Sequence, residues 1–153
     1  MAGLRIGFAT ASTSSGAPVD AVASYRTNVG YGAPSIVQHA GAWALDHARE
    51  LAAPVADGYR ARRDAAVAAA RTAGWHTTPP RGAMYLWLPV PGGADEWTFI
   101  RALLDDAGVV VTPGSAFGPG GGGWFRISLV AEPPVLADAI ARAGAVCRAR
   151  GWL

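Results

Sequence analysis

Residues 107–128 read Ala-Gly-Val-Val-Val-Thr-Pro-Gly-Ser-Ala-Phe-Gly-Pro-Gly-Gly-Gly-Gly-Trp-Phe-Arg-Ile-Ser, and this stretch decides the fold. Its β-branched and aromatic ends predict two strands, Val109–Val111 and Trp124–Val130. The Gly120–Gly123 run between them has no following Lys-Ser or Lys-Thr and opens no helix. It therefore predicts a flexible hairpin connection rather than a nucleotide phosphate loop.

The second of these strands carries a charged residue between two apolar ones. Arg126 alternates with Phe125 and Ile127, so its side chain is expected on the opposite face of the strand. Placing a guanidinium among aromatic neighbours without an anion costs free energy. This pattern favours a ligand site at Arg126 over an ordinary surface arginine.

The rest of the chain alternates between helical periodicity and short apolar runs. Proline and aspartate at helix starts, and glycine at helix ends, set most of the expected boundaries. The expected elements are strands over 5–9, 75–77 and 83–88, and helices over 18–29, 34–50, 54–73, 95–107 and 133–150. This order predicts an α/β chain in two parts, residues 1–53 and a small α/β domain, 54–153, led by a long connector helix.

Composition narrows the class of protein. The chain has 153 residues, 51% of them hydrophobic and 16% charged, which suits one domain or a domain plus a fragment. The net charge of +2 comes from scattered arginines, so no nucleic-acid surface is expected. The first residues lack the pattern of a signal peptide and no apolar run approaches a membrane span, which makes a cytoplasmic location the expectation.

Few residues offer metal or thiol chemistry. Cys147 is the only cysteine, so an intramolecular disulfide and a multi-cysteine zinc site are excluded. His39, His47 and His76 have no partner at metal-ligand spacing. We therefore expect no metal site, and an unreactive filler role for Cys147.

Three stretches together resemble the class I/II aminotransferases, which are fold-type-I pyridoxal-phosphate enzymes. They are residues 1–8, residues 79–91 (Pro-Pro-Arg-Gly-Ala-Met-Tyr-Leu-Trp-Leu-Pro-Val-Pro), and residues 107–118 closed by 124–128. The resemblance covers essentially the whole chain in the right order. It implies the C-terminal part of that fold, with residues 1–53 as a remnant of the large domain and residues 54–153 as the small one.

The resemblance also implies roles for individual residues. Arg126 matches the arginine that clamps the α-carboxylate of the amino-acid substrate, and Arg5 matches an arginine that helps to hold the cofactor phosphate. Met84 stands where many relatives carry Phe beside the reacting centre, and Tyr31 lies in a segment near the partner subunit and the active-site mouth. Residues 113–118 match a turn that shapes the pocket entrance.

The chain departs from the family pattern in several respects that bear on catalysis: it lacks the Schiff-base lysine and also the family's upstream parts, among them the aspartate that pairs with the pyridine nitrogen of the cofactor. All 13 basic residues are arginines, so no lysine is present to form the Schiff base with pyridoxal 5'-phosphate. The expectation is a chain that starts just after that lysine, is inactive alone and does not retain the cofactor. In the intact enzyme the resemblance implies a homodimer acting on a small amino acid and a 2-oxo acid.

Two other interpretations stay open at this point. The chain could be a non-catalytic binding or dimerisation module, or one half of a split enzyme whose partner supplies the lysine. Because residues 1–50 would have evolved to pack against other strands, we expect them to be poorly fixed or to drive association.

Overall fold

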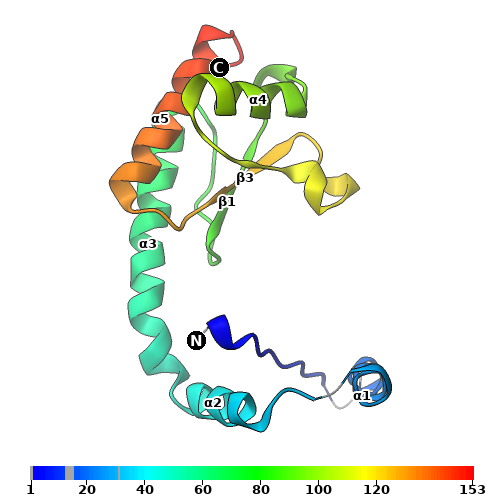
Figure 1. The fold of residues 1–153 in the computed structure, drawn as a ribbon. Helices are drawn as coiled ribbons and strands as arrows, with labels where there is room; N and C mark the ends of the chain where they lie inside the picture. Colours follow the sequence, from blue (N-terminus) through cyan, green and yellow to red (C-terminus); the bar gives the residue numbers. More distant parts are fainter. Residues whose placement is uncertain (1, 13–15, 31) are drawn as a thin grey trace. The chain divides into compact units, whose positions relative to one another are not determined.

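The computed structural model describes residues 2–12, 16–30 and 32–153. The chain divides into two compact units, residues 1–53 and 54–153, and the boundary falls inside helix α3 (Ala48–Ala73) (Figure 1). None of the helices within the described ranges is long and apolar enough to cross a membrane.

The first unit is helical. A 3-10 turn, Ala2–Leu4, precedes α1 (Ala17–Val29), which has a proline in its first turn and agrees with the helix predicted there. The predicted strand over 5–9 is wrong, because these residues are in no strand. A strand needs a neighbour to take up its N–H and C=O groups, and apolar character alone does not supply one.

The next helix boundary lies earlier than predicted. Helix α2 (Ser35–Asp46) ends at His47, whose ring stacks on Trp43 with centroids 4.1 Å apart. Helix α3 then starts at Ala48 and continues through Pro54, where the sequence predicts a break. A proline inside a helix loses the hydrogen bond from its own nitrogen, and its ring crowds the carbonyl four residues earlier. Helix α3 accommodates both effects at Pro54, which lies on its exposed side.

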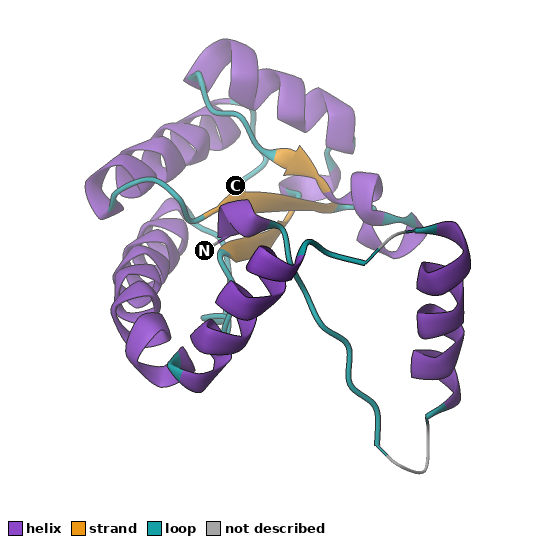
Figure 2. Ribbon diagram, turned by 60° about the horizontal axis from the view of Figure 1, so that its bottom comes forward, coloured by secondary structure: helices purple, strands orange, loops and turns teal. Residues whose placement is uncertain are grey.

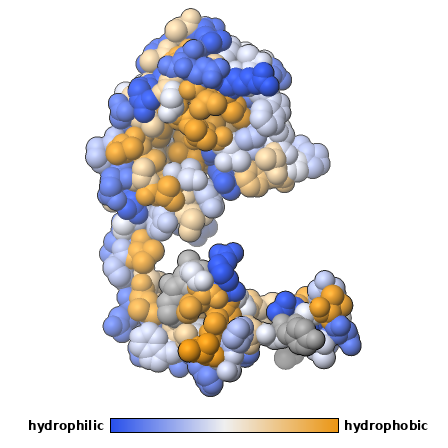
Figure 3. Space-filling view, viewed as in Figure 1, coloured by the Kyte–Doolittle hydropathy of each residue, from blue (hydrophilic) through white to orange (hydrophobic). Residues whose placement is uncertain are grey.

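The described residues of this first unit form no buried core. Every one of them with an assigned burial keeps at least part of its surface exposed. Large apolar side chains of α1 and α2 are exposed, among them Tyr25, Val29, Ile36, Trp43 and Leu45. Figure 3 shows hydrophobic residues on the surface of this unit. The prediction that this region is poorly fixed or drives association stays a prediction.

The second unit is a two-layer α/β structure built on a small sheet. Its strands are β1 (Tyr85–Pro89), β2 (Thr112–Pro113) and β3 (Trp124–Ser128), in the order β1-β3-β2 with both pairs antiparallel (Figure 2). Its helices are the second part of α3, then α4 (Glu96–Ala107) and α5 (Pro133–Ala149). Short 3-10 turns connect them at Pro91–Gly93, Gly114–Phe117 and Pro119–Gly121.

One face of this sheet packs against the helices. Leu86, Leu88 and Phe125 are at most 2% exposed and share a core with apolar residues of α3, α4 and α5. The helix residues of that core include Ala66, Val67, Ala70, Phe99, Leu103, Leu136, Ile140, Ala143 and Cys147. The opposite face of β1 and β3 does not contribute to this core.

Two of the strands predicted for this unit are absent or displaced. Residues 75–77 form no strand: Trp75 is buried at 3% exposure and its indole donates to the carbonyl oxygen of Pro89 at 3.2 Å. The strand predicted at Val109–Val111 begins only at Thr112, because the Val109 amide donates to the Leu103 carbonyl and completes the end of α4. Both segments follow a helix whose last carbonyls accept the hydrogen bonds that a strand would need.

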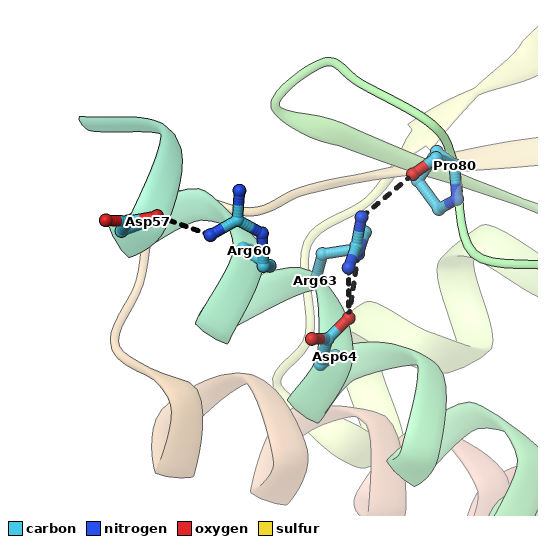
Figure 4. A network of polar contacts seen from close by, with 5 residues as sticks. All are labelled: Asp57, Arg60, Arg63, Asp64 and Pro80. Carbon is cyan, nitrogen blue, oxygen red and sulfur yellow. Dashed lines mark hydrogen bonds and ion pairs between the residues drawn. The ribbon is translucent and has the colours of Figure 1, made fainter. Parts of the chain in front are cut away.

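Polar contacts fix α3 to the connection that leads into β1. The Arg63 guanidinium donates to the Pro80 carbonyl at 3.4 Å and pairs with Asp64 at 2.7 Å (Figure 4). One turn earlier, Arg60 pairs with Asp57 on the exposed side of the same helix. These are surface contacts, which contribute little free energy each, so the core described above is the main source of stability.

Candidate functional site

The face of the sheet opposite the core gathers aromatic residues around one arginine. Trp87 and Thr112 both lie directly opposite Arg126 in the strand register, and Tyr85 lies opposite Ser128. Cross-strand partners project from the same face of a sheet. Arg126 thus shares its face with Tyr85, Trp87 and Thr112, as the alternation with Phe125 and Ile127 predicts.

Two aromatic rings enclose the Arg126 guanidinium. Its central carbon lies 4.0 Å from the centre of the Tyr85 ring and 4.5 Å from that of Phe117. Trp87 meets Phe117 edge to face with centroids 5.3 Å apart. A guanidinium that lies over a ring face keeps its N–H groups in its own plane, where a planar anion can be bound.

The hydrogen bonds of Arg126 are incomplete within the described residues. One terminal nitrogen, Nη2, donates to the Thr112 hydroxyl at 3.5 Å. Nε is buried and has no hydrogen-bond partner among the residues that the structure describes. The Nε of Arg62 is also buried without a partner, but the Arg62 guanidinium pairs with Glu132, whereas Arg126 has no acidic partner among the described residues. Because buried polar groups are almost always satisfied, this arrangement fits an arginine that receives an anionic ligand.

The loop that supplies Phe117 is anchored to the start of α4. One carboxylate oxygen of Glu96 accepts hydrogen bonds from both the amide and the hydroxyl of Ser115, each at 3.0 Å. The Gly118 amide donates in turn to the Ser115 carbonyl at 3.2 Å. Glu96 therefore fixes the turn that carries Phe117.

The hydrogen bonds to Glu96 should make the free energy of unfolding depend on pH. The backbone hydrogen bond from Ser115 is the largest cause that holds the pKa of Glu96 below its ordinary value. A carboxylate with a lowered pKa adds stability above its unfolded pKa, and that stability is lost as pH falls through the lowered value. Replacing Glu96 by Gln should reduce the free energy of unfolding at pH 7 by up to about 1 kcal/mol, the usual net value of one hydrogen bond.

Urea unfolding of both proteins at pH 7 and near pH 3 measures this effect. The difference between wild type and Glu96→Gln should shrink as the pH falls, because protonation of Glu96 removes the same charge that the substitution removes. A difference of equal size at both pH values would contradict the assignment.

Other residues with predicted roles are placed less fully. Tyr31 lies outside the described residues. Met84 directly precedes β1, is 41% exposed, and accepts a hydrogen bond from the Leu129 amide on its carbonyl. Arg5 belongs to the first unit, where its side chain is exposed and its backbone has φ of +50°.

The sequence left the partners of Arg126 unidentified. The alternation in residues 83–88 shows that Tyr85 and Trp87 share a face, yet it does not distinguish core from pocket. Phe117 lies in the turn 113–118 that the family resemblance places at the pocket entrance. Neither its contact with Arg126 nor the role of Glu96 follows from the sequence, because both depend on the conformation of the loop between β2 and β3. The one sequence feature that indicates Phe117 as a partner of Arg126 is its place in the turn that precedes the strand of Arg126.

Thiol and metal chemistry find no support in the described structure. Cys147 is fully buried, and burial raises the pKa of its thiol to about 11, which agrees with an unreactive filler role. Within the described ranges, no group of three histidine, cysteine or acidic side chains could hold a metal ion. Arg126 and its neighbours are therefore the candidate site.

Comparisons with known proteins point to one family. The chain is 37% identical over 142 residues to the LL-diaminopimelate aminotransferase of Desulforudis audaxviator, covering 93% of this chain and 36% of that one. A similar enzyme of Nostoc is 38% identical over 144 residues, again with 93% and 36% covered. The chain thus spans about a third of the length of these relatives.

Solved structures agree with the sequence relatives. An aminotransferase from Staphylococcus aureus matches 97% of this chain and 39% of its own with a TM-score of 0.83 and 28% identity. A probable N-succinyldiaminopimelate aminotransferase from Thermus thermophilus matches 84% of this chain and 34% of its own with a TM-score of 0.76 and 30% identity. The sequence model for aminotransferase class I and II matches residues 1–142, and the chain belongs to this family.

Proposed function

We propose that this chain is the C-terminal portion of a pyridoxal-phosphate-dependent amino-acid aminotransferase, in which Arg126 binds the α-carboxylate of the amino acid and of the 2-oxo acid. The observation that carries the proposal is the Arg126 guanidinium held between Tyr85 and Phe117 with a buried, unpartnered Nε within the described structure. A planar fork of this kind suits a bidentate carboxylate. Membership of the family supplies the reaction class.

The cofactor needs more than these 153 residues supply. When bound, pyridoxal phosphate provides the electron sink for amino-group transfer. Arg5 has the donor geometry for a phosphate, yet its side chain is exposed and no lysine is present to attach the cofactor. The residues present thus do not fit a complete cofactor site, and we infer that this chain alone neither retains the cofactor nor transfers amino groups.

The remaining roles follow from the same proposal. Met84 would lie beside the reacting centre and Tyr31 near the mouth of the site, close to the partner subunit of a homodimer. Residues 1–53 would be part of the large domain and residues 54–153 the small domain. The protein would act in the cytoplasm on an amino acid and a 2-oxo acid as small-molecule substrates. LL-diaminopimelate is the first donor to test because the named relatives are aminotransferases for it.

A chimera tests the reaction class directly. The 142 residues of this chain that align with the Desulforudis audaxviator enzyme replace their counterparts in it, and the remainder of that enzyme is expected to supply the missing lysine. The chimera should transfer the amino group from LL-diaminopimelate to a 2-oxo acid. Arg126→Ala in the chimera should lower kcat/KM about a hundredfold or more, because the carboxylate loses a bidentate, charge-assisted partner.

Arg126→Lys and Arg101→Ala are the controls. Lysine keeps the charge without the fork, so it should recover only part of the lost kcat/KM. Arg101, on the outer side of α4, should leave kcat/KM unchanged. An active chimera that tolerates Arg126→Ala would remove Arg126 from the carboxylate site, and a folded chimera without activity would contradict the reaction class.

The absence of lysine keeps one second candidate, a split enzyme. Its test mixes this chain with the separate remainder of the relative. Activity from the two separate chains would favour the split enzyme, and activity from the fused chimera alone would favour the single-chain enzyme.

A further inference from the structure

The Arg126 side chain is held by two aromatic rings rather than by an acidic partner. Tyr85 from β1 and Phe117 from the turn Gly114–Phe117 lie 4.0 Å and 4.5 Å from its guanidinium carbon. Its one hydrogen bond to a described side chain, to Thr112, is long at 3.5 Å. Among the ion pairs of the described residues none involves Arg126. Its positive charge is thus left for a ligand while its orientation is fixed.

Stacking suits this task because it leaves the hydrogen-bonding edge free. An acidic neighbour would orient an arginine by occupying the same N–H groups that a substrate carboxylate needs. Aromatic faces attract the cation through the ring and use none of its in-plane donors. A long arginine that is already ordered also loses less conformational entropy when it binds its ligand.

Different parts of the fold determine the positions of Tyr85 and Phe117. Tyr85 lies in a strand whose backbone pairs with β3, so the sheet fixes the position of its Cα. Phe117 lies in a turn, is 50% exposed, and contacts Trp87 edge to face. Its position depends on Ser115 two residues earlier, whose amide and hydroxyl both donate to Glu96. A chain of contacts therefore runs from the start of α4 through the turn to the guanidinium.

We propose that Tyr85 and Phe117 are positioning residues that hold the Arg126 guanidinium ready for a carboxylate, and that Glu96 acts as a third by anchoring the Phe117 turn. The proposal rests on the carboxylate-binding role proposed for Arg126. Under this proposal Tyr85 and Phe117 contact Arg126, Glu96 contacts the turn that carries Phe117, and none of the three needs to touch the substrate.

NMR spectroscopy of the full 153-residue chain tests it. The Arg126 Nε–Hε signal, assigned by its loss in Arg126→Lys, should be shifted to low frequency by the ring currents of Tyr85 and Phe117. Sodium pyruvate is the carboxylate probe, titrated against sodium chloride at equal ionic strength. The signal should move with pyruvate and not with chloride.

Variants then separate positioning from simple stability. Tyr85→Leu and Phe117→Leu should each reduce the ring-current shift, because one of the two rings is lost, and should each weaken pyruvate binding about tenfold. Tyr85→Phe should keep both properties because it keeps the ring. Glu96→Gln should weaken binding, whereas Asp95→Asn, which alters the neighbouring carboxylate that caps α4 through the Thr98 amide, should not.

The outcomes distinguish this proposal from the one it rests on. No response of Arg126 to pyruvate in the wild-type chain would overturn its carboxylate role and this inference together. A wild-type response with equal affinity in Tyr85→Leu and Phe117→Leu would overturn this inference alone. The indole signal of Trp75, which donates to Pro89 inside the core, reports whether each variant is folded; if both leucine variants lose it, the comparison of Glu96→Gln with Asp95→Asn decides.

Discussion

Replacing Phe125 by Ala is expected to lower the free energy of unfolding of residues 54–153 by about 3–5 kcal/mol. Phe125 is 1% exposed in the middle of β3, the central strand of the sheet. Its ring lies 4.8 Å from that of Phe99 and 5.9 Å, edge to face, from that of Trp75. Removing it takes away buried apolar area and leaves a cavity between sheet and helices that rigid aromatic neighbours cannot fill.

Urea unfolding followed by tryptophan fluorescence measures the loss. The matched control is Phe117→Ala, which removes the same ring from the opposite face of the sheet, where Phe117 is 50% exposed. That variant should lose less than about 1 kcal/mol, since a half-exposed ring gives up less apolar surface to water and leaves no enclosed cavity. Equal losses in the two variants would contradict the assignment of the core to the Phe125 face.

Periodicity and end signals were enough to predict the helices of this unit. Helix α4 runs over Glu96–Ala107, with Asp95 capping its first turn and Gly108 at φ of +61° ending it. Both signals are local, because a cap is satisfied by atoms three residues away and a left-handed glycine needs no partner. The sequence predicts such elements well since nothing distant decides them.

The strands were harder to predict than the helices, because a strand forms only where a neighbouring strand pairs with its N–H and C=O groups. The apolar residues at 5–9, 75–77 and 109–111 all have strand-like composition, and none of these segments forms a strand. Val111 is buried all the same, at 9% exposure, and Trp75 at 3%. Val110, by contrast, is 83% exposed. Apolar composition therefore predicts neither the burial of each residue nor the pairing of a strand, because both depend on tertiary contacts that no local pattern contains.

In the candidate site too, the sequence predicts what depends on local pattern and not what depends on tertiary contacts. The side of β3 from which Arg126 projects follows from the two-residue period of a strand, and the structure confirms it. Phe117 and Glu96 are joined to Arg126 by a loop whose path depends on close backbone packing between its two turns. Family resemblance identified the arginine, and only the structure shows what surrounds it.

Replacing Gly114 by Ala is expected to lower the free energy of unfolding by about 3 kcal/mol, because the two turns of the loop between β2 and β3 pack closely against each other at Gly114. A β-carbon at Gly114 would overlap the carbonyl oxygen of Gly121 and lie 2.7 Å from that of Trp124. Both obstacles are backbone atoms, and one of them belongs to the first residue of β3, so neither can move aside as a flexible side chain would. Overpacking of this kind costs up to about 3 kcal/mol, and the upper end applies where the surroundings cannot yield.

Gly120→Ala provides the control within the same loop. A β-carbon at Gly120 meets nothing within 4 Å, so this variant should stay within about 0.5 kcal/mol of the wild type. Urea unfolding compares the two variants, and the Arg126 Nε–Hε signal reports on the site. Because Gly114 begins the turn that carries Phe117, Gly114→Ala should reduce the ring-current shift of Arg126 even at urea concentrations where the core remains folded. A Gly114→Ala protein as stable as Gly120→Ala, with an unchanged Arg126 signal, would show that the two turns are not packed against each other and that Phe117 owes its position to some other contact.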